Sequence, residues 1–437
     1  MLELARNGRS ALLVAATGAG KTLAGFLPTI CELAERPIEG LHTLYVSPLK
    51  ALAVDVQRNL IGPIEEMGLP IRVETRTGDT PSDRKARQRV KPPQVLLTTP
   101  ESLSLLLSYS DSPIMFEGLT SIVVDELHGF AKEKRGDLLA LSMSRLQTLA
   151  PGLRRVGLSA TISDPDAYRS WLAPDSDMDT VDLTIGDPGA EPDLSILIPQ
   201  NKIPWGGHSG YHAIADVMRL IEQHKMTLVF SNTRGLAELI FQKLWNENDK
   251  GLPIGIHHGS LSVEARRKVE AAMAAGKLRG LVATASLDLG IDWGDVDLVI
   301  QMGAPKGSSR LLQRIGRANH RLDEPSKGIL VPGNRFEYLE GRAALDAIDD
   351  GELDPEVFRP GALDVLAQHI LAMAVAAPFQ QEQLLAEVRS AAPYASLKQE
   401  TFEEILNFIA TGGYALKAYD RFRRLVPESG GMWRITK

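Results

Sequence analysis

The chain has 437 residues, of which 44% are hydrophobic and 24% charged, proportions typical of a globular protein with two or three domains. Its net charge of −7 excludes a broadly basic nucleic-acid-binding surface, and its one cysteine excludes an internal disulfide or a cysteine-based zinc site. No apolar run is long enough to span a bilayer and no signal-like segment follows Met1, so the sequence predicts a cytoplasmic protein with no membrane partner.

The first feature along the chain is a glycine-rich turn between a strand and a helix. Leu12–Val14 predicts the strand. Apolar residues then recur on one helical face, with the cysteine as a small core residue: Leu23, Phe26, Leu27, Ile30, Cys31 and Ala34. Such a turn points backbone N–H groups and a helix dipole at a phosphate chain. The phosphate-binding residues it predicts are Thr17, Gly18, Ala19, Gly20, Lys21 and Thr22.

Two of these residues have side-chain roles in this reading. Lys21 reaches the β- and γ-phosphates, and the Thr22 hydroxyl holds magnesium. The first position of the phosphate-loop pattern is Ala15 in place of glycine, so a chance glycine-rich turn is the alternative. The intact second half, in its strand–turn–helix context, favours a site for a nucleoside triphosphate.

Short apolar or β-branched runs then alternate with helical patterns. This alternation predicts a doubly wound parallel sheet with strands buried on both faces. The runs lie at Thr43–Ser47, Val95–Thr98, Ser121–Val124 and Val156–Ser159.

Two adjacent acids, Asp125 and Glu126, follow one of these runs. Paired carboxylates at the carboxyl edge of a sheet are costly unless they meet a cation, and the phosphate loop lies at the same edge. We therefore expect Asp125 to hold the magnesium that Thr22 contacts, and Glu126 to orient and deprotonate the attacking water.

A second series of strand patterns follows a stretch rich in Asp, Pro and Gly. The stretch, from Pro174 to Gly210, reads as a linker carrying one strand at Leu194–Ile198. The runs after it predict a second α/β domain without a phosphate loop: Thr227–Phe230, Pro253–Ile256, Gly280–Thr284, Leu298–Ile300 and Gly328–Val331.

Beyond about Arg342 the patterns become short helices closed by a hairpin. One helix carries Leu384, Leu385 and Val388, and the next carries Phe402, Ile405, Leu406 and Ile409. Leu425–Val426 and Trp433–Ile435 flank the turn-forming Glu428–Gly431. Helices followed by a hairpin predict a winged helix, with an arbitrary helical cap as the alternative.

Two segments are locally basic in this acidic chain. Arg84–Lys91 carries five Lys or Arg residues, and residues 414–437 carry six against Asp420 and Glu428. Each segment could contact nucleic acid, but a solvated face is the favoured interpretation when each is taken alone.

Taken in order, the motifs resemble motifs I to VI of superfamily 2 helicases. After the phosphate loop they are Val124–His128, Ser159–Thr161, Val229–Arg234, Ala283–Asp292 and Gln313–Arg317. Further fragments resemble the large helicase-related (Lhr) group: Ser47–Leu52, Thr77–Asp79, Thr99–Glu101, His257–Ser260 and Gln313–Arg321. Gly303–Arg310 and Trp205–His208 are similar to its bacterial ligase-associated DNA-repair branch.

This resemblance implies two RecA-like doubly wound parallel-sheet domains followed by a winged helix, over residues 1–185, 186–342 and 343–437. It implies ATP in the cleft between the first two domains, with Arg317 as an arginine finger to the γ-phosphate. Gly290, Asp292 and Arg321 join the nucleotide-binding set, although either His320 or Arg321 could supply a second finger. The residues that would couple hydrolysis to domain movement are His128, Ser159, Thr161 and Gln313.

The resemblance also implies a nucleic-acid track of loop residues that grip phosphates and read no bases. In the first domain its members are Ser47, Lys50, Thr77, Gly78, Thr99 and Pro100. In the second domain they are Thr233, Arg234, Gly259 and Thr284.

The function implied is that of an ATP- and Mg²⁺-dependent helicase that translocates 3′ to 5′ on single-stranded DNA in DNA repair. Its partners by resemblance are an ATP-dependent DNA ligase and a nuclease. The alternatives are a helicase for RNA or RNA–DNA hybrids and an ATP-gated clamp that does not unwind. Relative to the Lhr group we expect the chain to be truncated at both ends.

Overall fold

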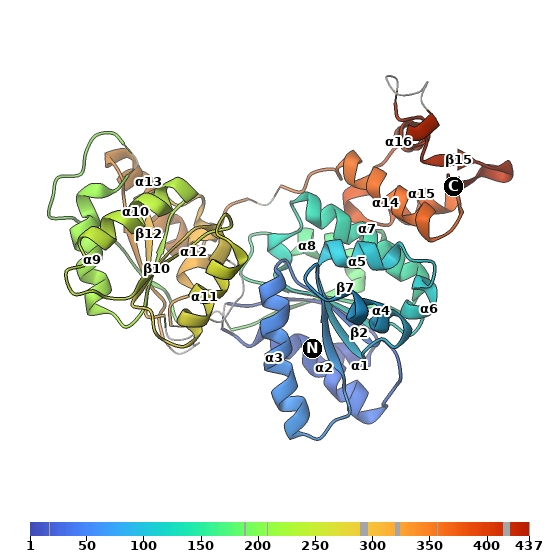
Figure 1. Cartoon of the computed structure of the whole chain (residues 1–437), viewed down its shortest axis with the longest axis horizontal. Coiled ribbons are helices and arrows are strands. Elements are labelled where there is room, and N and C mark those ends of the chain that lie inside the picture. The colour runs from blue at the N-terminus through green and yellow to red at the C-terminus, as the bar shows by residue number, and fades with distance from the viewer. Residues whose placement is uncertain are drawn as a thin grey trace.

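The structure is a computed structural model, and it describes residues 1–16, 18–187, 189–207, 209–288, 296–319, 324–355, 357–413 and 420–436. Two parallel β-sheets and one small antiparallel sheet follow one another along the chain, each with its own helices (Figure 1). This arrangement confirms the predicted fold class. None of the helices in the described ranges is long and apolar enough to cross a membrane.

The first sheet has seven parallel strands in the order β3-β4-β2-β5-β6-β1-β7. Its strands are β1 Ser10–Val14, β2 Thr43–Val46, β3 Val73–Arg76, β4 Val95–Thr98, β5 Ser121–Val124, β6 Arg154–Ser159 and β7 Val181–Ile185. The predicted strands are confirmed, but β3 and β7 were not expected. Both are edge strands, and the alternating or polar sequences that suit an edge lack the continuous apolar run that marked the central strands.

Eight helices accompany this sheet: α1 Leu2–Arg6, α2 Lys21–Glu35, α3 Lys50–Glu66, α4 Ser82–Val90, α5 Pro100–Leu107, α6 Ser112–Phe116, α7 Lys134–Leu149 and α8 Pro165–Leu172. The predicted apolar face of α2 is partly wrong. Phe26 and Ile30 are buried, but Leu23 is 56% exposed and Cys31 is half-buried. The helix is rotated because Gly25 faces the sheet, where an added Cβ would lie 2.9 Å from a Leu158 methyl carbon.

The second sheet has six parallel strands in the order β10-β11-β9-β12-β13-β8. They are β8 Asp193–Ile196, β9 Thr227–Phe230, β10 Ile254–His257, β11 Gly280–Ala283, β12 Leu298–Met302 and β13 Lys327–Val331. Its helices are α9 Ile214–Gln223, α10 Arg234–Asn246, α11 Val263–Ala274, α12 Ser308–Ile315 and α13 Arg335–Asp349. The predicted strands are confirmed. The expected linker contains β7 as well as β8, so its unpaired part is shorter than predicted.

The last segment contains the predicted helices and hairpin. Its helices are α14 Leu363–Ala376, α15 Gln381–Arg389 and α16 Gln399–Thr411, and its strands are β14 Phe379–Gln380, β15 Leu425–Pro427 and β16 Met432–Ile435. All seven apolar residues predicted to lie on the faces of two helices are buried in α15 and α16. The hairpin β15–β16 pairs antiparallel as expected, and β14 adds a third strand.

Short 3₁₀ helices complete the described elements: η1 Leu127–Gly129, η2 Pro174–Ser176, η3 Met178–Thr180, η4 Tyr211–Ala213, η5 Ala285–Leu287, η6 Ala392–Tyr394, η8 Asp420–Phe422 and η9 Ser429–Gly431. The winged-helix segment packs on the first sheet's unit, where α14 and α15 contact α7 (Figure 1). Leu139 and Met143 of α7 share one hydrophobic core with Leu366 and Ile370 of α14.

The domain boundaries remain a prediction. Helix α13 runs through residue 342 and packs on β8, with Leu345 in a core of the second sheet.

Candidate functional site

The phosphate loop leaves β1 and enters α2 through two left-handed glycines. Gly18 and Gly20 have φ values of +84° and +71°, which residues with a Cβ rarely adopt. The Lys21 amine donates hydrogen bonds to the carbonyl oxygens of Ala15 and Ala16, at 2.9 and 2.8 Å. Burial lowers the pKa of Lys21, and the nearby Glu126 and Asp125 oppose this shift. The loop and its lysine therefore lie near the acid pair, at the sheet edge where the sequence places both. Thr17 lies outside the described residues.

Asp125 follows β5 directly and is buried, 5% exposed. The Tyr45 hydroxyl donates to one of its oxygens, and the backbone N–H of Glu126 donates to the other at 2.9 Å. Burial and the charge of Glu126 raise the pKa of Asp125 to about 7. A cation bound here would lower the pKa of this buried carboxyl and keep it ionised, so Asp125 suits the role of a metal ligand.

The described residues include no cluster of three or more His, Cys, Asp or Glu side chains that could hold a metal by themselves. Magnesium does not need such a cluster, because it binds through one or two protein ligands and substrate phosphates. Thr22, in the first turn of α2, and Asp125 fit that requirement.

Glu126 is connected to the segment that follows β6. It has a left-handed φ of +50°, and its Oε2 lies 3.4 Å from Nε2 of His128. The backbone N–H of Ala160 donates to His128 Nδ1 at 3.3 Å, and Ser159 Oγ lies 3.1 Å from the same nitrogen. Because Nδ1 accepts, the neutral ring carries its proton on Nε2, which faces Glu126.

Arg317 brings the second sheet's unit to this acid pair. One of its terminal nitrogens lies 3.9 Å from Glu126 Oε1 and donates to the carbonyl oxygen of Asp288 at 3.3 Å. Arg317 and Glu126 are each 7% exposed. The structure therefore places the predicted finger at the predicted base. Gly290, Asp292, His320 and Arg321, the remaining predicted nucleotide contacts, lie outside the described residues.

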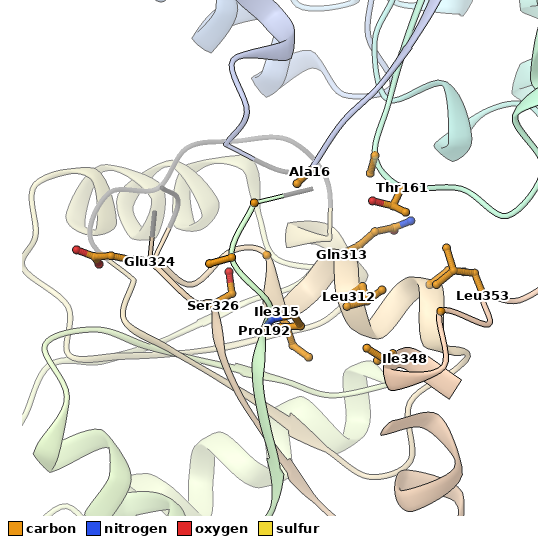
Figure 2. Close-up of a pocket in the computed structure, with 16 residues that line it drawn as sticks. Ala16, Thr161, Pro192, Leu312, Gln313, Ile315, Glu324, Ser326, Ile348 and Leu353 are labelled. Carbon is orange, nitrogen blue, oxygen red and sulfur yellow. The ribbon is translucent and has the colours of Figure 1, made fainter. Parts of the chain in front are cut away.

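A cavity of about 300 Å³ lies beside this junction. Ala16 and Thr161 of the first unit face Leu312 and Gln313 of α12 across it, and Gln313 points toward Thr161 (Figure 2). Pro192 of the inter-sheet connection forms part of its wall. Two of the predicted coupling residues, Thr161 and Gln313, therefore meet where the two units approach each other.

A buried network on the second unit was missed by sequence reasoning. Arg314 Nε donates to Asp288 Oδ1 at 2.9 Å, and its Nη1 donates to Gln301 Oε1 at 2.6 Å. Arg310, one turn earlier on α12, donates to the other oxygen of Asp288 at 2.8 Å. The signal available was two arginines spaced four residues apart on one helix face, near an aspartate in the preceding motif.

The predicted nucleic-acid residues of the first unit follow three neighbouring strands. Ser47 follows β2, Thr77 follows β3 and Thr99 follows β4, so all lie at one edge of the sheet. Arg135 connects two of these loops, since it donates to the Pro48 carbonyl oxygen at 2.8 Å and pairs with Glu101. Sequence reasoning missed Arg135. Gly78 lies in the loop after β3, Pro100 is the first residue of α5, and the backbone of Lys50 begins α3.

The second unit repeats this arrangement. Thr233 follows β9, Gly259 lies two residues after β10 and Thr284 follows β11, three adjacent strands of that sheet. Arg234 is exposed and donates to Ser260 Oγ at 2.9 Å. An added Cβ at Gly259 would meet no atom within 4 Å, so this backbone is open to a ligand.

Three of the five basic residues around α4 form ion pairs within the protein. Arg84 and Arg87 pair with Glu74, and Arg89 pairs with Asp111. These pairs favour the interpretation of a solvated face. Part of the second basic segment lies outside the described residues.

Comparison with known proteins gives three family matches. Residues 1–169 match the DEAD/DEAH box helicase family, residues 211–321 the helicase conserved C-terminal domain, and residues 346–437 the winged helix domain of large helicase-related protein.

Two curated relatives and one solved structure are similar over nearly the whole chain. The Lhr helicase/probable uracil glycosylase of Mycolicibacterium smegmatis is 37% identical over 96% of this chain and 31% of its own length. The ATP-dependent helicase Lhr-Core of Methanothermobacter thermautotrophicus is 37% identical over 92% of this chain and 49% of its own length. The structure of Mycobacterium smegmatis helicase Lhr bound to ssDNA and AMP-PNP is 36% identical with a TM-score of 0.88, covering 99% of this chain and 57% of that one. The chain therefore spans a half or less of the length of these curated relatives.

Proposed function

Because the chain belongs to the Lhr helicases, whose helicase core and winged helix it carries, we propose that it is a nucleic-acid-stimulated ATPase that translocates on single-stranded DNA and unwinds duplexes. The observation that carries the proposal is the approach of Arg317 from one unit to Glu126 in the other, at 3.9 Å. An ATPase whose finger and base lie on separate bodies hydrolyses ATP when the bodies close.

The chain's own residues supply binding, orientation and proton transfer. Lys21 exchanges its two carbonyl partners for the β- and γ-phosphates, and the N–H groups of the glycine turn hold the same phosphates. Magnesium held by Thr22 and Asp125 would neutralise charge on the phosphate oxygens. Glu126 orients the attacking water and takes its proton, while Arg317 stabilises charge on the γ-phosphate.

His128 gives this site a connection to the cleft. Its contacts with Glu126, the Ser159 hydroxyl and the Ala160 N–H tie the base to the segment that contains Thr161. Thr161 and Gln313 then face each other across the inter-unit cavity. Closing this cavity would bring Gln313 against the segment that is tied to Glu126.

Single-stranded DNA is the proposed ligand of the loops at the two sheet edges. The M. smegmatis Lhr structure is bound to ssDNA and AMP-PNP, which supports both DNA and ATP as ligands here. The predicted residues of these loops are of types that carry hydroxyl or backbone N–H groups, which suit phosphates and carry no base information. A track of donors also explains how a chain of net charge −7 can bind nucleic acid.

The finer parts of the proposal rest on family resemblance. They are 3′-to-5′ polarity, a role in DNA repair, and partnership with an ATP-dependent DNA ligase and a nuclease. An RNA or RNA–DNA-hybrid helicase and an ATP-gated clamp are the competing functions.

Strand displacement measured beside ATP hydrolysis tests the function. We expect ssDNA-stimulated hydrolysis and displacement of a duplex with a 3′ single-stranded tail, and neither activity in Lys21→Ala. Hydrolysis without displacement would favour the clamp. Faster displacement of an RNA–DNA hybrid with a single-stranded RNA tail than of the DNA duplex would favour a helicase for RNA or RNA–DNA hybrids.

A further inference from the structure

The connection between α13 and α14 (residues 350–355 and 357–362) runs from the second sheet's unit to the first. Its far end is attached to α7, where the buried Asp137 accepts a hydrogen bond from the Ala362 N–H at 3.0 Å and pairs with Arg359 at 2.9 Å. Before reaching that point, the connection passes the N-terminus of α12, the helix that carries Gln313 and leads to Arg317.

Asp354 of this connection binds the first turn of α12. The Ser309 N–H donates to Asp354 Oδ2 at 3.0 Å, and the Asp354 N–H donates to Ser309 Oγ at 3.3 Å. The neighbouring Ser308 hydroxyl donates to the Glu352 carbonyl oxygen at 3.3 Å. A carboxylate in this position accepts a hydrogen bond from a helix N–H that has no partner within the helix, and it interacts favourably with the positive end of the helix dipole.

Gly307 makes this contact possible. Its φ is +99°, and a Cβ added there would lie 2.3 Å from Asp354 Oδ2. A side chain at this position would therefore displace the carboxylate. The Gly307–Ser309 sequence, which the nucleotide and DNA contacts leave unexplained, is accounted for by Asp354.

Asp354 also contacts the first unit. The Ser163 hydroxyl donates to the Asp354 carbonyl oxygen at 2.9 Å. Ser163 follows the Ser159–Thr161 segment, whose backbone holds His128 beside Glu126. One residue is thus bonded to the helix that leads to the finger and to the segment that supports the base.

We propose that Asp354 is a positioning residue that holds α12 in register with the Ser159–Ser163 segment, so that Arg317 reaches the γ-phosphate when DNA closes the cleft. This inference rests on the proposed function. Helix α12 has eight residues, about two turns, so fixing its first turn constrains the place where Arg317 emerges. Asp354 contacts no reacting atom, and its role is to orient α12.

The test compares Asp354→Ala with Asp350→Ala, an exposed aspartate of the same connection, in the full chain. We expect Asp354→Ala to lower kcat for ssDNA-stimulated hydrolysis by about 2- to 30-fold, the range for residues that modulate coupling. The KM for ATP and the affinity for ssDNA without nucleotide should match those of Asp350→Ala. A stimulated kcat within twofold of the control would overturn the proposal.

Ser163→Ala provides a second variant, because Ser163 is exposed and its loss leaves the bonds between Asp354 and α12 intact. It should lower the same kcat, and the double variant should be no worse than the more severe single one. Full multiplication of the two effects would mean that the residues act separately.

Amide hydrogen exchange gives a readout that needs no activity. Exchange of the Ser309 amide should accelerate in Asp354→Ala and not in Asp350→Ala. If the unaltered chain shows no ssDNA-stimulated hydrolysis, the proposed function fails, and unchanged exchange would separately overturn the anchoring of α12.

Discussion

Glu126 is restrained on three sides, by its left-handed backbone, by His128 Nε2 and by Arg317. Such restraint suits a base that must orient one water. Glu126→Gln should lower kcat by at least about 100-fold, because the amide can hold water but cannot take its proton. The affinity for ATP should remain within a few-fold. Single-turnover hydrolysis and nucleotide titration measure the two effects.

Glu133→Gln is the matched control for this prediction, since Glu133 is an exposed glutamate of the same loop region. A Glu126→Gln protein that turns over ATP as fast as the control would exclude Glu126 as the base.

Arg317 belongs to the hydrolysis site, where it lies beside Glu126 and donates to the Asp288 carbonyl oxygen. Arg317→Ala should reduce ssDNA-stimulated hydrolysis by about 1,000-fold or more, as loss of an arginine finger does elsewhere. The affinity for ssDNA without nucleotide should equal that of Arg342→Ala, which removes an exposed arginine from α13. The opposite result, weaker DNA binding with normal hydrolysis, would assign Arg317 to the DNA track.

His369 of α14 is a buried histidine. Burial lowers its pKa to about 3, and the charge of the nearby Arg145 adds to this shift. Above pH 6.5 the ring is neutral in both folded and unfolded chains. Below pH 6.5 the unfolded chain takes up a proton that the folded chain does not, so stability falls with pH toward 3. His369→Leu should remove about 2 kcal/mol of the stability lost between pH 6.5 and 5, measured by denaturant unfolding at each pH. Equal pH slopes in the two proteins would contradict this assignment.

At the scale of elements, the attachment of α14 to α7 depends on a buried acid. Asp137 has a side chain that is 2% exposed and is balanced by Arg359 and the Ala362 N–H. Arg359→Ala leaves this carboxylate without its cation and should reduce the free energy of unfolding by about 1–3 kcal/mol, below the full cost for a buried pair because Arg359 is 37% exposed. Arg342→Ala, which removes an exposed pair, should cost less than about 0.5 kcal/mol. Equal losses in the two variants would show that the Asp137 pair is not stabilising.

The strands that sequence patterns missed share a location at the sheet margins. The strands β3, β7 and β14 lie at edges, where one side of the backbone is unpaired and polar residues are tolerated. The prediction of the buried face of α2 was partly wrong for a related reason. Gly25, which has no side chain to mark burial in the sequence, packs against the sheet. The periodicity of apolar residues detects the burial of large side chains and does not detect the burial of backbone.

At the scale of the whole molecule, the hydrophobic cores are not shared equally among the three parts of the chain. One hydrophobic core joins the first unit to the winged helix, whereas the second unit has cores of its own. We expect the first unit and the winged helix to open together and the second unit to open separately. Native-state hydrogen exchange in low denaturant should give α7 and α14 a common opening free energy, different from that of β9 and β12. A winged helix that opens with the second unit would refute this division.

The sequence by itself determined the local motifs of this protein. The phosphate turn, the central strands, the acid pair after β5 and the hairpin are all short-range patterns, because strand, turn and helix chemistry acts over a few residues. Family resemblance extended them to Arg317 and to the loops of the nucleic-acid track, and the structure places the described members at the matching sheet edges.

Only the tertiary structure decided which of these patterns meet. Four contacts join residues that are distant in the chain. Arg317 approaches Glu126, and Asp288 pairs with Arg310 and Arg314. Asp354 contacts both units, and the winged helix packs on α7. No periodicity records such pairings, because they depend on how packed units are oriented and on which buried charges can be balanced once water is excluded.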